Sequence, residues 1–319
     1  MVKSNKNESS LTTAYGGEGW SPRIQTHQAE IGSLWGVCGV NNEYAPLEAV
    51  LLHAPGAEWE DIPDPDAMLM ANAPDLALAR EQHDAIAQFY RGAGVNVHYV
   101  EPNQLPPPNL MFCADLFFMT PEGAILARPA STVRAGEERW IARRLADLGI
   151  PIARTLRGGA TFEGADAQWL NSETVLIAHG LRTNAEGVSQ VSDALRGMGV
   201  DVIQVDLPIG TMHLMGMVRF LDKDLAVGWL GRLSYVAVEA LRAHGYRVIF
   251  IPNEAEAKNH ALNFVTLGPK EIFMAAGKPI TQKFYESQGV TCHTVETGEL
   301  NKAAGGIGCL TGILRRAGN

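Results

Sequence analysis

A pattern marked by glycine recurs five times along the chain, and it constrains the fold more than any other feature. The marker residues are Gly94, Gly149, Gly199, Gly245 and Gly289, with gaps of 55, 50, 46 and 44 residues. A bulky apolar residue stands four positions before each glycine, and a large apolar or aromatic residue follows each one directly. This offset predicts a helix that ends in a left-handed glycine cap and leads into a strand whose alternate residues face the core.

Short apolar runs precede each predicted helix. One set of runs covers residues 49–52, 124–126, 175–178, 225–227 and 272–274, and a second set precedes most of these at 115–119, 167–170, 217–221 and 264–267. The repeating unit is therefore strand, strand, helix, strand. No unit of this size buries its apolar face alone, so the five units must share one core. We predict an α/β fold in which five ββαβ units form a propeller around a central active-site channel.

The two ends of the chain differ in character. Residues 1–44 form a polar N-terminal extension, whereas residues 45–319 are predicted to form a single five-repeat catalytic domain. With 46% hydrophobic residues, the chain has enough apolar side chains for one large core. The segment 62–74 interrupts the first unit with Pro63, Pro65 and Pro74. Both a mobile lid over a pocket and an ordinary surface loop fit this composition.

Charge and cysteine content exclude several classes of function. The net charge of −9 makes nucleic acid an improbable partner. The four cysteines are widely spaced and lack metal-type clustering, so neither a metal nor another cofactor is expected. The apolar runs are too short to cross a bilayer, and the first ten residues do not resemble a signal peptide. We therefore expect a cytoplasmic protein with free thiols and no membrane partner.

One chemically suggestive polar residue follows each unit, 14 to 21 positions after its marker glycine. These residues are Asp115, Glu163, His213, Asn263 and Cys309. In a ring, equivalent positions converge on the axis, so the pattern predicts a pocket that holds all five. Carboxylates match the planar donor fork of a guanidinium, a thiolate can attack its carbon, and a histidine can protonate a leaving amine. These residues also have purely structural interpretations. Cys309 could be a buried thiol, His213 a core histidine, and Glu163 an acid in a turn.

The motifs around these residues resemble the guanidino-group-modifying enzymes of the pentein fold, which include dimethylarginine dimethylaminohydrolases, arginine deiminases and amidinotransferases. The resemblance extends from about Leu47 to the C-terminus. The family's nucleophile motif is matched by Gly-Ile-Gly-Cys-Leu-Thr, which contains Cys309. Its Glu-Gly-Gly-Asp motif is matched by Glu-Gly-Ala-Asp starting at Glu163, and its His-Leu motif by His213 and the leucine after it.

The resemblance implies a role for each matched residue. The catalytic residues are Cys309, His213 and Glu163, and the substrate-binding residues are Asp115, Asp166, Arg128, Arg182, Asn263 and Met215. The two arginines match positions that hold the substrate's α-carboxylate in dimethylarginine hydrolases.

Two positions depart from the family. Ala114 stands where those hydrolases have glutamate, and Met215 stands where arginine deiminases and many amidinotransferases have aspartate. These departures favour a substituted guanidine, with Met215 packed on the substituent.

The predicted function is a cysteine-dependent hydrolase of a substituted, arginine-like guanidine. A covalent thiouronium would precede release of a ureido product and an amine. The expected partner is thus a small guanidino compound, and self-association into a homo-oligomer is left open. The main alternatives are an amidinotransferase and an arginine deiminase or dihydrolase. A non-catalytic ring protein is disfavoured by the complete set of reactive residues. A dinucleotide-binding enzyme is disfavoured because no Gly-x-Gly-x-x-Gly motif follows a strand.

Overall fold

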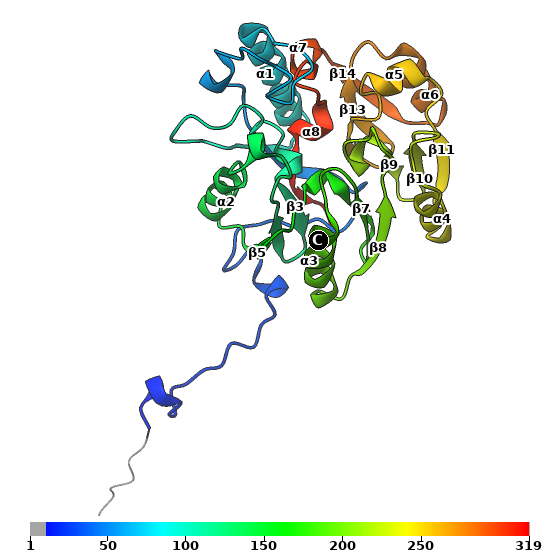
Figure 1. Cartoon of the computed structure of the whole chain (residues 1–319). Coiled ribbons are helices and arrows are strands. Elements are labelled where there is room, and N and C mark those ends of the chain that lie inside the picture. The colour runs from blue at the N-terminus through cyan, green and yellow to red at the C-terminus, as the bar shows by residue number, and fades with distance from the viewer. Residues whose placement is uncertain (1–10, 319) are drawn as a thin grey trace, which may run out of the picture.

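The computed structural model describes residues 11–318 of the chain, and within this range it contains five three-stranded sheets. In each sheet the central strand pairs antiparallel with one neighbour and parallel with the other. A helix connects the two parallel strands of every sheet. Figure 1 shows these connecting helices at the periphery of the molecule. The predicted α/β class, with several small sheets, is confirmed.

The elements of each sheet follow the predicted unit. The first sheet contains β15 (Gly312–Arg316), β1 (Leu47–Leu52) and β2 (Asn96–Tyr99), with α1 (Leu76–Gly92) between its parallel strands. The second sheet contains β3 (Phe117–Thr120), β4 (Gly123–Leu126) and β5 (Ile152–Thr155), with α2 (Glu138–Asp147), and the third contains β6 (Ala167–Asn171), β7 (Thr174–His179) and β8 (Asp201–Asp206), with α3 (Ala185–Gly197). The fourth contains β9 (Val218–Asp222), β10 (Leu225–Gly228) and β11 (Arg247–Phe250), with α4 (Tyr235–Ala243). The fifth contains β12 (Val265–Gly268), β13 (Glu271–Ala275) and β14 (Thr291–Val295), with α6 (Pro279–Ser287).

Shorter helices lie in the connections. Three are α-helical, namely α5 (Glu254–Lys258), α7 (Gly298–Asn301) and α8 (Ile307–Leu310). Seven are 3-10 helices, namely η1 (Thr13–Tyr15), η2 (Gln28–Glu30), η3 (Ala57–Trp59), η4 (Cys113–Asp115), η5 (Thr132–Arg134), η6 (Gly164–Asp166) and η7 (Leu214–Gly216). Three of these, η4, η6 and η7, directly precede the first strand of a sheet.

The five marker glycines have the left-handed backbone that the repeat predicts, with φ between 71° and 86°. Each follows its helix and precedes the strand that runs parallel to the sheet's centre. One predicted strand begins later than expected, because residues 113–115 form η4 and β3 starts at Phe117. The turn places the Asp115 side chain beside the other polar residues instead of within the strand ladder.

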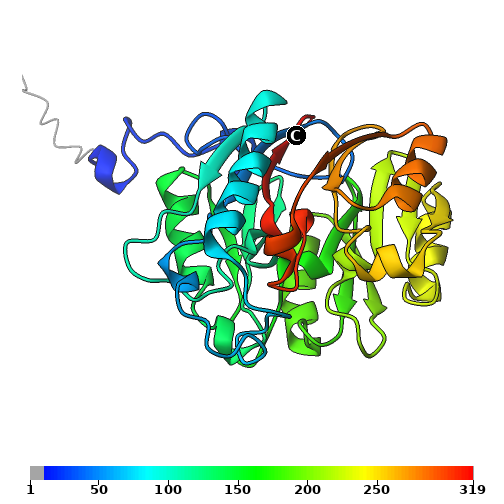
Figure 2. The same ribbon diagram turned by 90° about the horizontal axis from the view of Figure 1, so that it is seen from above.

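The first sheet joins the first and the last strand of the described residues. Its leading strand is β15, which pairs antiparallel with β1. The first repeating unit, which starts at β1, therefore obtains its antiparallel strand from the C-terminal end of the chain. Figure 2 shows this C-terminal segment between the first and last units. The pairing fixes the position of α8, which immediately precedes β15.

The leading strands of the sheets contact one another in sequence. From β6, the Trp169 indole donates to the carbonyl of Met119 in β3 at 3.0 Å, and Gln168 donates to Val218 O in β9 at 3.1 Å. Thr266 in β12 donates to a carbonyl of β9, and Arg316 in β15 donates to Thr266 O at 2.9 Å. Side-chain donors thus satisfy backbone groups where small sheets meet.

Residues 11–46 contain η1 and η2, and the part around η1 extends away from the body of the molecule (Figure 1). Gly36 donates to Gly149 O at 2.7 Å, and a Glu43 carboxylate oxygen accepts from the backbone N of Trp169 at 3.1 Å. These contacts attach the segment from Gly36 onward to the second and third sheets.

Between residues 11 and 318, no helix combines the length and the apolar composition that crossing a bilayer requires.

Candidate active site

Cys309 lies in α8, a single helical turn held between buried neighbours. A Cβ atom at Gly308 would lie 2.7 Å from the Asn263 side-chain oxygen, so this position requires glycine. The Thr311 hydroxyl donates to the carbonyl of Ile307 at 2.8 Å and shares a 2.9 Å hydrogen bond with the Tyr90 hydroxyl. These contacts give the thiol a fixed position.

Asn263 contacts Cys309 twice. Its Nδ2 donates to Sγ at 2.9 Å, and its Oδ1 accepts from the Cys309 backbone N at 3.2 Å. Burial raises the pKa of the thiol to about 11, and the Asp115 charge adds to the rise, although the Asn263 hydrogen bond opposes it. The thiol of the free protein is therefore neutral near pH 7 and requires an additional positive charge to ionise.

His213 faces two carboxylates. Its Nε2 lies 2.7 Å from Glu163 Oε2, and its Nδ1 lies 3.8 Å from Asp115 Oδ1. Burial lowers the pKa of the imidazole, but the charge of Asp115 and the hydrogen bond to Glu163 outweigh it and raise the pKa to about 9. At neutral pH the imidazole is thus a cation that has a proton to give.

Glu163 is fully buried and has donors on both oxygens. Arg182 Nη1 lies 3.2 Å from Oε1, Arg134 Nη1 lies 3.3 Å from Oε2, and the Ala130 backbone N donates to Oε1 at 3.2 Å. Burial opposes ionisation, but His213 and the two arginines hold the pKa of this carboxyl far below its usual range. Glu163 is therefore a permanent anion whose main neighbour among the reactive groups is His213.

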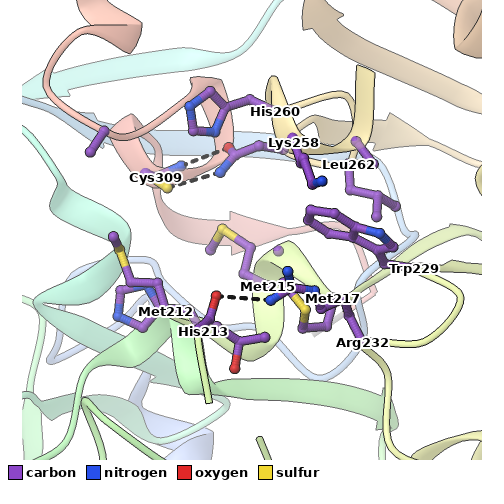
Figure 3. Close-up of a pocket in the computed structure, with 16 residues that line it drawn as sticks. Met212, His213, Met215, Met217, Trp229, Arg232, Lys258, His260, Leu262 and Cys309 are labelled. Atoms are coloured by element: carbon purple, nitrogen blue, oxygen red, sulfur yellow. Dashed lines mark hydrogen bonds between the residues drawn. The ribbon is translucent and has the colours of Figure 1, made fainter. Parts of the chain in front are cut away.

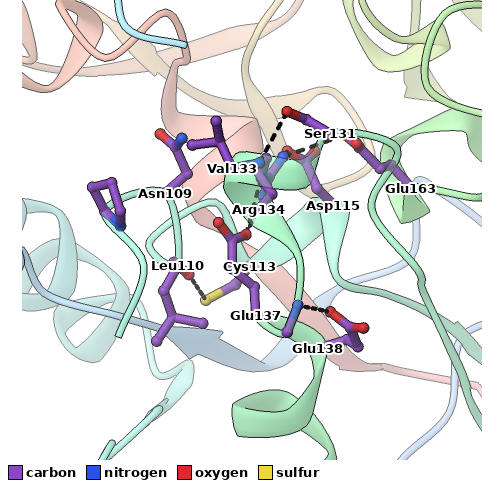
Figure 4. Close-up of polar contacts among 12 residues, drawn as sticks. Asn109, Leu110, Cys113, Asp115, Ser131, Val133, Arg134, Glu137, Glu138 and Glu163 are labelled. Carbon is purple, nitrogen blue, oxygen red and sulfur yellow. Dashed lines mark hydrogen bonds and ion pairs between the residues drawn. The ribbon is translucent and has the colours of Figure 1, made fainter. Parts of the chain in front are cut away.

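Asp115 has one oxygen engaged in a hydrogen bond and one that accepts none, although His213 lies near it. Its Oδ2 accepts from Arg134 Nη1 at 2.7 Å, whereas the buried Oδ1 has no hydrogen-bond partner. Arg134 is itself buried, and its Nε donates to Glu137 at 2.9 Å (Figure 4). The Asp115 Oδ1 atom is therefore an acceptor free to receive a donor from a ligand.

Asp166 connects two turns of the site. Its Oδ2 accepts from the Thr183 hydroxyl at 2.7 Å, and its Oδ1 accepts from the Leu214 backbone N at 3.1 Å. Burial raises the pKa of this carboxyl to about 6. Since both oxygens are engaged by the protein, Asp166 is placed to hold the backbone after His213, and the structure gives it no free atom for the predicted contact with substrate.

The two arginines predicted to bind the α-carboxylate lie in different surroundings. Arg182 is buried beside Glu163, whereas Arg128 is exposed and its Nη1 donates to Ala160 O at 2.7 Å. Sequence reasoning did not identify Arg134, which lies beside Asp115 and Arg182. The repeat carries a signal for it, because Arg134 follows Asp115 by the same 19 residues that separate Arg182 from Glu163.

Two cavities meet at Cys309. The smaller, about 20 Å³, is lined by Asp115, Arg134 and Arg182. The larger, about 330 Å³, is lined by His213 and by Met215. Figure 3 shows the larger cavity, with Cys309 and His213 on one side. The thiol and the imidazole therefore contact the same space.

The segment 62–74 covers the smaller cavity. Leu69, which has a left-handed backbone with φ 61°, lines this cavity. The Met68 carbonyl accepts from Asn109 at 2.8 Å, and the backbone of Ala71 donates to Lys302 O at 2.8 Å. The segment thus bridges two walls of the site, so a substrate that enters the smaller cavity must displace it.

Asp115, Glu163 and His213 place one ligand-type atom each within 4.8 Å of one another, close enough to hold a metal ion. However, the guanidinium of Arg134 contacts both carboxylates. The positive charge that a metal would supply to these carboxylates is therefore already provided by a protein side chain.

Comparisons with known proteins show which enzymes the chain is similar to. The model of the arginine deiminase family matches residues 226–316. The chain is 27% identical over 242 residues to an N(G),N(G)-dimethylarginine dimethylaminohydrolase of Streptomyces coelicolor, covering 76% of this chain and 88% of the relative. It is 50% identical over 64 residues, 19% of this chain, to an arginine deiminase of Clostridium perfringens, covering 16% of that protein.

The fold is similar to solved structures of the same enzymes. A dimethylarginine dimethylaminohydrolase of Pseudomonas aeruginosa in complex with citrulline aligns with a TM-score of 0.70 at 23% identity, covering 83% of this chain and 98% of that one. The resemblance to the guanidino-group-modifying enzymes of the pentein fold is therefore confirmed. Relatives that match about three quarters of the chain include two N(G),N(G)-dimethylarginine dimethylaminohydrolases.

Proposed function

We propose that this chain is a cysteine-dependent hydrolase of a substituted guanidine, with an Nω-substituted arginine as the favoured substrate. The observation that carries the proposal is the placement of Cys309 and the cationic His213 on one cavity, beside the free oxygen of Asp115. Relatives named as dimethylarginine dimethylaminohydrolases support hydrolysis of a guanidine C–N bond. The products are a ureido compound and an amine.

Substrate binding uses the smaller cavity, which at about 20 Å³ accepts an arginine-sized group only after segment 62–74 is displaced. The guanidinium donates to Asp115 Oδ1, while the α-carboxylate contacts Arg134 and Arg182, the two cations that line this cavity. Glu163 is engaged by four donors, so we assign it to His213 and not to the substrate. Asn263 serves as a positioning residue for the thiol.

The assignment of Arg134 predicts a substrate-dependent effect. Arg134→Lys is expected to lower kcat/KM for an arginine-type substrate by about tenfold or more relative to its decarboxylated analogue, because lysine cannot form the bidentate contact. Steady-state kinetics with both substrates measures this ratio, and Arg128→Lys is the matched control. An equal change in Arg128→Lys would instead support the exposed Arg128 as the carboxylate ligand.

The reaction begins when the cationic guanidinium enters beside Cys309. Its charge lowers the pKa of the thiol, and the thiol proton passes to solvent. The thiolate then attacks the guanidine carbon and forms an S–C bond. As the C–N bond breaks, His213 transfers its proton to the departing amine, leaving a covalent thiouronium on Cys309.

Hydrolysis regenerates the protein. The now neutral His213 takes a proton from water, whose oxygen attacks the thiouronium carbon. The S–C bond then breaks, the hydroxyl proton of the adduct passes to the departing sulfur, and the ureido product leaves. Cys309 is again a neutral thiol and His213 again a cation. Glu163 stabilises the imidazolium at both stages, because it is a buried anion 2.7 Å from Nε2.

The alternatives share the first half of this reaction. An amidinotransferase would admit an acceptor amine instead of water, and an arginine deiminase would act on unsubstituted arginine. The buried Met215, on the wall of the larger cavity, favours a substituent over a polar contact to plain guanidine. No comparable observation favours the transferase.

We also propose the finer features of the fold and setting. The donor contacts that link β3, β6, β9, β12 and β15 support a five-bladed propeller around a central channel, formed by residues 45–319 with 1–44 as an extension. The four free cysteines support a cytoplasmic location. A nucleic-acid partner remains unexpected from the net charge of −9, and homo-oligomerisation remains open.

A mass-spectrometric product screen tests the function. The protein is incubated with arginine, methylated arginines, agmatine and shorter guanidino acids, with and without glycine or ornithine. A ureido product formed without an acceptor is the expected result. Product that forms only with an added amine would establish the transferase, and best turnover of plain arginine would establish the deiminase or dihydrolase.

A further inference from the structure

The larger cavity beside Cys309 exceeds what a small leaving amine needs. Its volume is about 330 Å³, and at about 30 Å³ per water-sized group it holds roughly ten heavy atoms. Dimethylamine, with one nitrogen and two methyl groups, would leave most of this space unfilled. The cavity lies on the His213 side of the thiol, whereas Asp115 and the two buried arginines line the smaller one. A group released by protonation from His213 therefore departs into it.

The inner walls of this cavity are apolar and polarisable. Met215, Met217, Trp229 and Leu262 are all buried and all line it. Figure 3 shows Trp229 and Leu262 across the cavity from Cys309 and His213. Such walls suit an alkyl chain, because thioethers and aromatic rings pack against methylene groups without requiring hydrogen bonds.

Basic side chains line the outer part. Arg232 lies over the Trp229 ring at 5.4 Å, and its Nη1 donates to Gly210 O at 3.0 Å. These two contacts fix the guanidinium while leaving other donors available. Lys258 also lines the cavity, and His260 adds a ring whose pKa burial and nearby Lys278 lower.

The acidic groups nearby do not neutralise this charge. Among the described residues, the cavity lining contains no aspartate or glutamate. Glu254, just outside, pairs with Lys258 at 3.4 Å and accepts from the Trp229 indole at 2.7 Å. One carboxylate thus faces two cations, Lys258 and Arg232, so these three groups together carry a net positive charge.

We propose that this cavity binds an alkyl substituent that ends in a carboxylate, so that the amine released from the guanidine is an amino acid. This inference rests on the proposed function. The substrate is then a guanidine with two anionic ends: one carboxylate reaches Arg134 and Arg182, and the other reaches Arg232. Hydrolysis breaks the C–N bond to the substituent, His213 supplies the amine proton, and water supplies the ureido oxygen.

A substrate series of matched length tests the proposal. Purified protein is assayed with Nω-methyl-, Nω-butyl- and Nω-(3-carboxypropyl)-arginine and with the neutral carbamoylpropyl analogue. We expect kcat/KM for the carboxypropyl compound to exceed that of the carbamoylpropyl compound by about tenfold or more. Arg232→Met should reduce this ratio to near one, whereas Arg242→Met, on the exposed end of α4, should leave it unchanged.

A second variant tests whether the substituent occupies the larger cavity. A side chain at Gly216 would meet no atom within 4 Å of its Cβ, and this residue lines the cavity. Gly216→Leu should therefore lower kcat/KM for the butyl and carboxypropyl substrates far more than for the methyl substrate. The inference would be overturned if the wild-type protein hydrolyses methyl-arginine but gives the carboxypropyl and carbamoylpropyl compounds the same kcat/KM. That result would leave the proposed function intact. Absence of turnover with every guanidine would overturn both.

Discussion

Replacing Cys309 with serine is expected to lower kcat by about 10⁴-fold or more, because a buried hydroxyl is a much poorer nucleophile than a thiolate. The side chains are similar in size, so Asn263 and the α8 turn can retain their places. Binding of the guanidine should persist, since Asp115, Arg134 and Arg182 are unchanged. Steady-state kinetics combined with equilibrium binding of a labelled substrate measures both effects.

The matched control is Cys292→Ser, in a half-buried cysteine on β14 that lines neither of the two cavities at Cys309. It should retain the kinetics of the original protein. Turnover by Cys309→Ser within tenfold of the original rate would exclude covalent catalysis by this residue. Loss of substrate binding together with activity would indicate instead that the substitution disturbs the site as a whole.

Replacing Glu163 with glutamine is expected to lower kcat by about 10²- to 10⁴-fold, the usual contribution of a proton-transfer step. The substitution keeps the shape of the side chain but removes the charge that helps to raise the pKa of His213 to about 9. In the substrate complex the thiol is ionised, so the alkaline limb of the kcat profile follows loss of the His213 proton. A lower His213 pKa therefore moves that limb to lower pH.

Stability must be measured beside activity in this variant. Removing one partner from a buried ion-pair network commonly costs about 3–5 kcal/mol of unfolding free energy, and Arg134 and Arg182 both contact Glu163. Urea denaturation at fixed pH gives that loss separately. Asp206→Asn is the control, since Asp206 pairs with the exposed His179 at 3.0 Å, outside the site. A fall in kcat without movement of the alkaline limb would show that Glu163 acts only as a structural residue.

Much of the fold could be predicted because the repeat has a physical period. Five marker glycines at left-handed positions, each between a helix and a strand, fix where the chain turns. The origin of the first unit's leading strand could not be inferred from local patterns. That strand is β15, whose pairing with β1 joins segments more than 250 residues apart.

The candidate site was predicted best where each residue follows a unit at a similar offset. His213, Glu163 and Asp115 form one hydrogen-bonded and ion-paired cluster, and Asn263 contacts Cys309 as that placement suggested. Arg134 was missed because it lies in η5, where the chain turns back toward Asp115 after β4. The hydrogen bonds that occupy both oxygens of Glu163 could not be predicted either, because their donors come from segments far apart in sequence.

The most direct test of the mechanism traps the covalent adduct. His213→Gly removes the group that protonates the amine and activates water, so a substrate whose leaving group needs no proton should react once and stop. An isothiourea analogue of arginine, which releases a thiol, meets this condition. Intact-protein mass spectrometry followed by peptide mapping should find one adduct per chain, located on Cys309. An adduct on another residue, or no adduct while the original protein consumes the analogue, would contradict nucleophilic attack by Cys309.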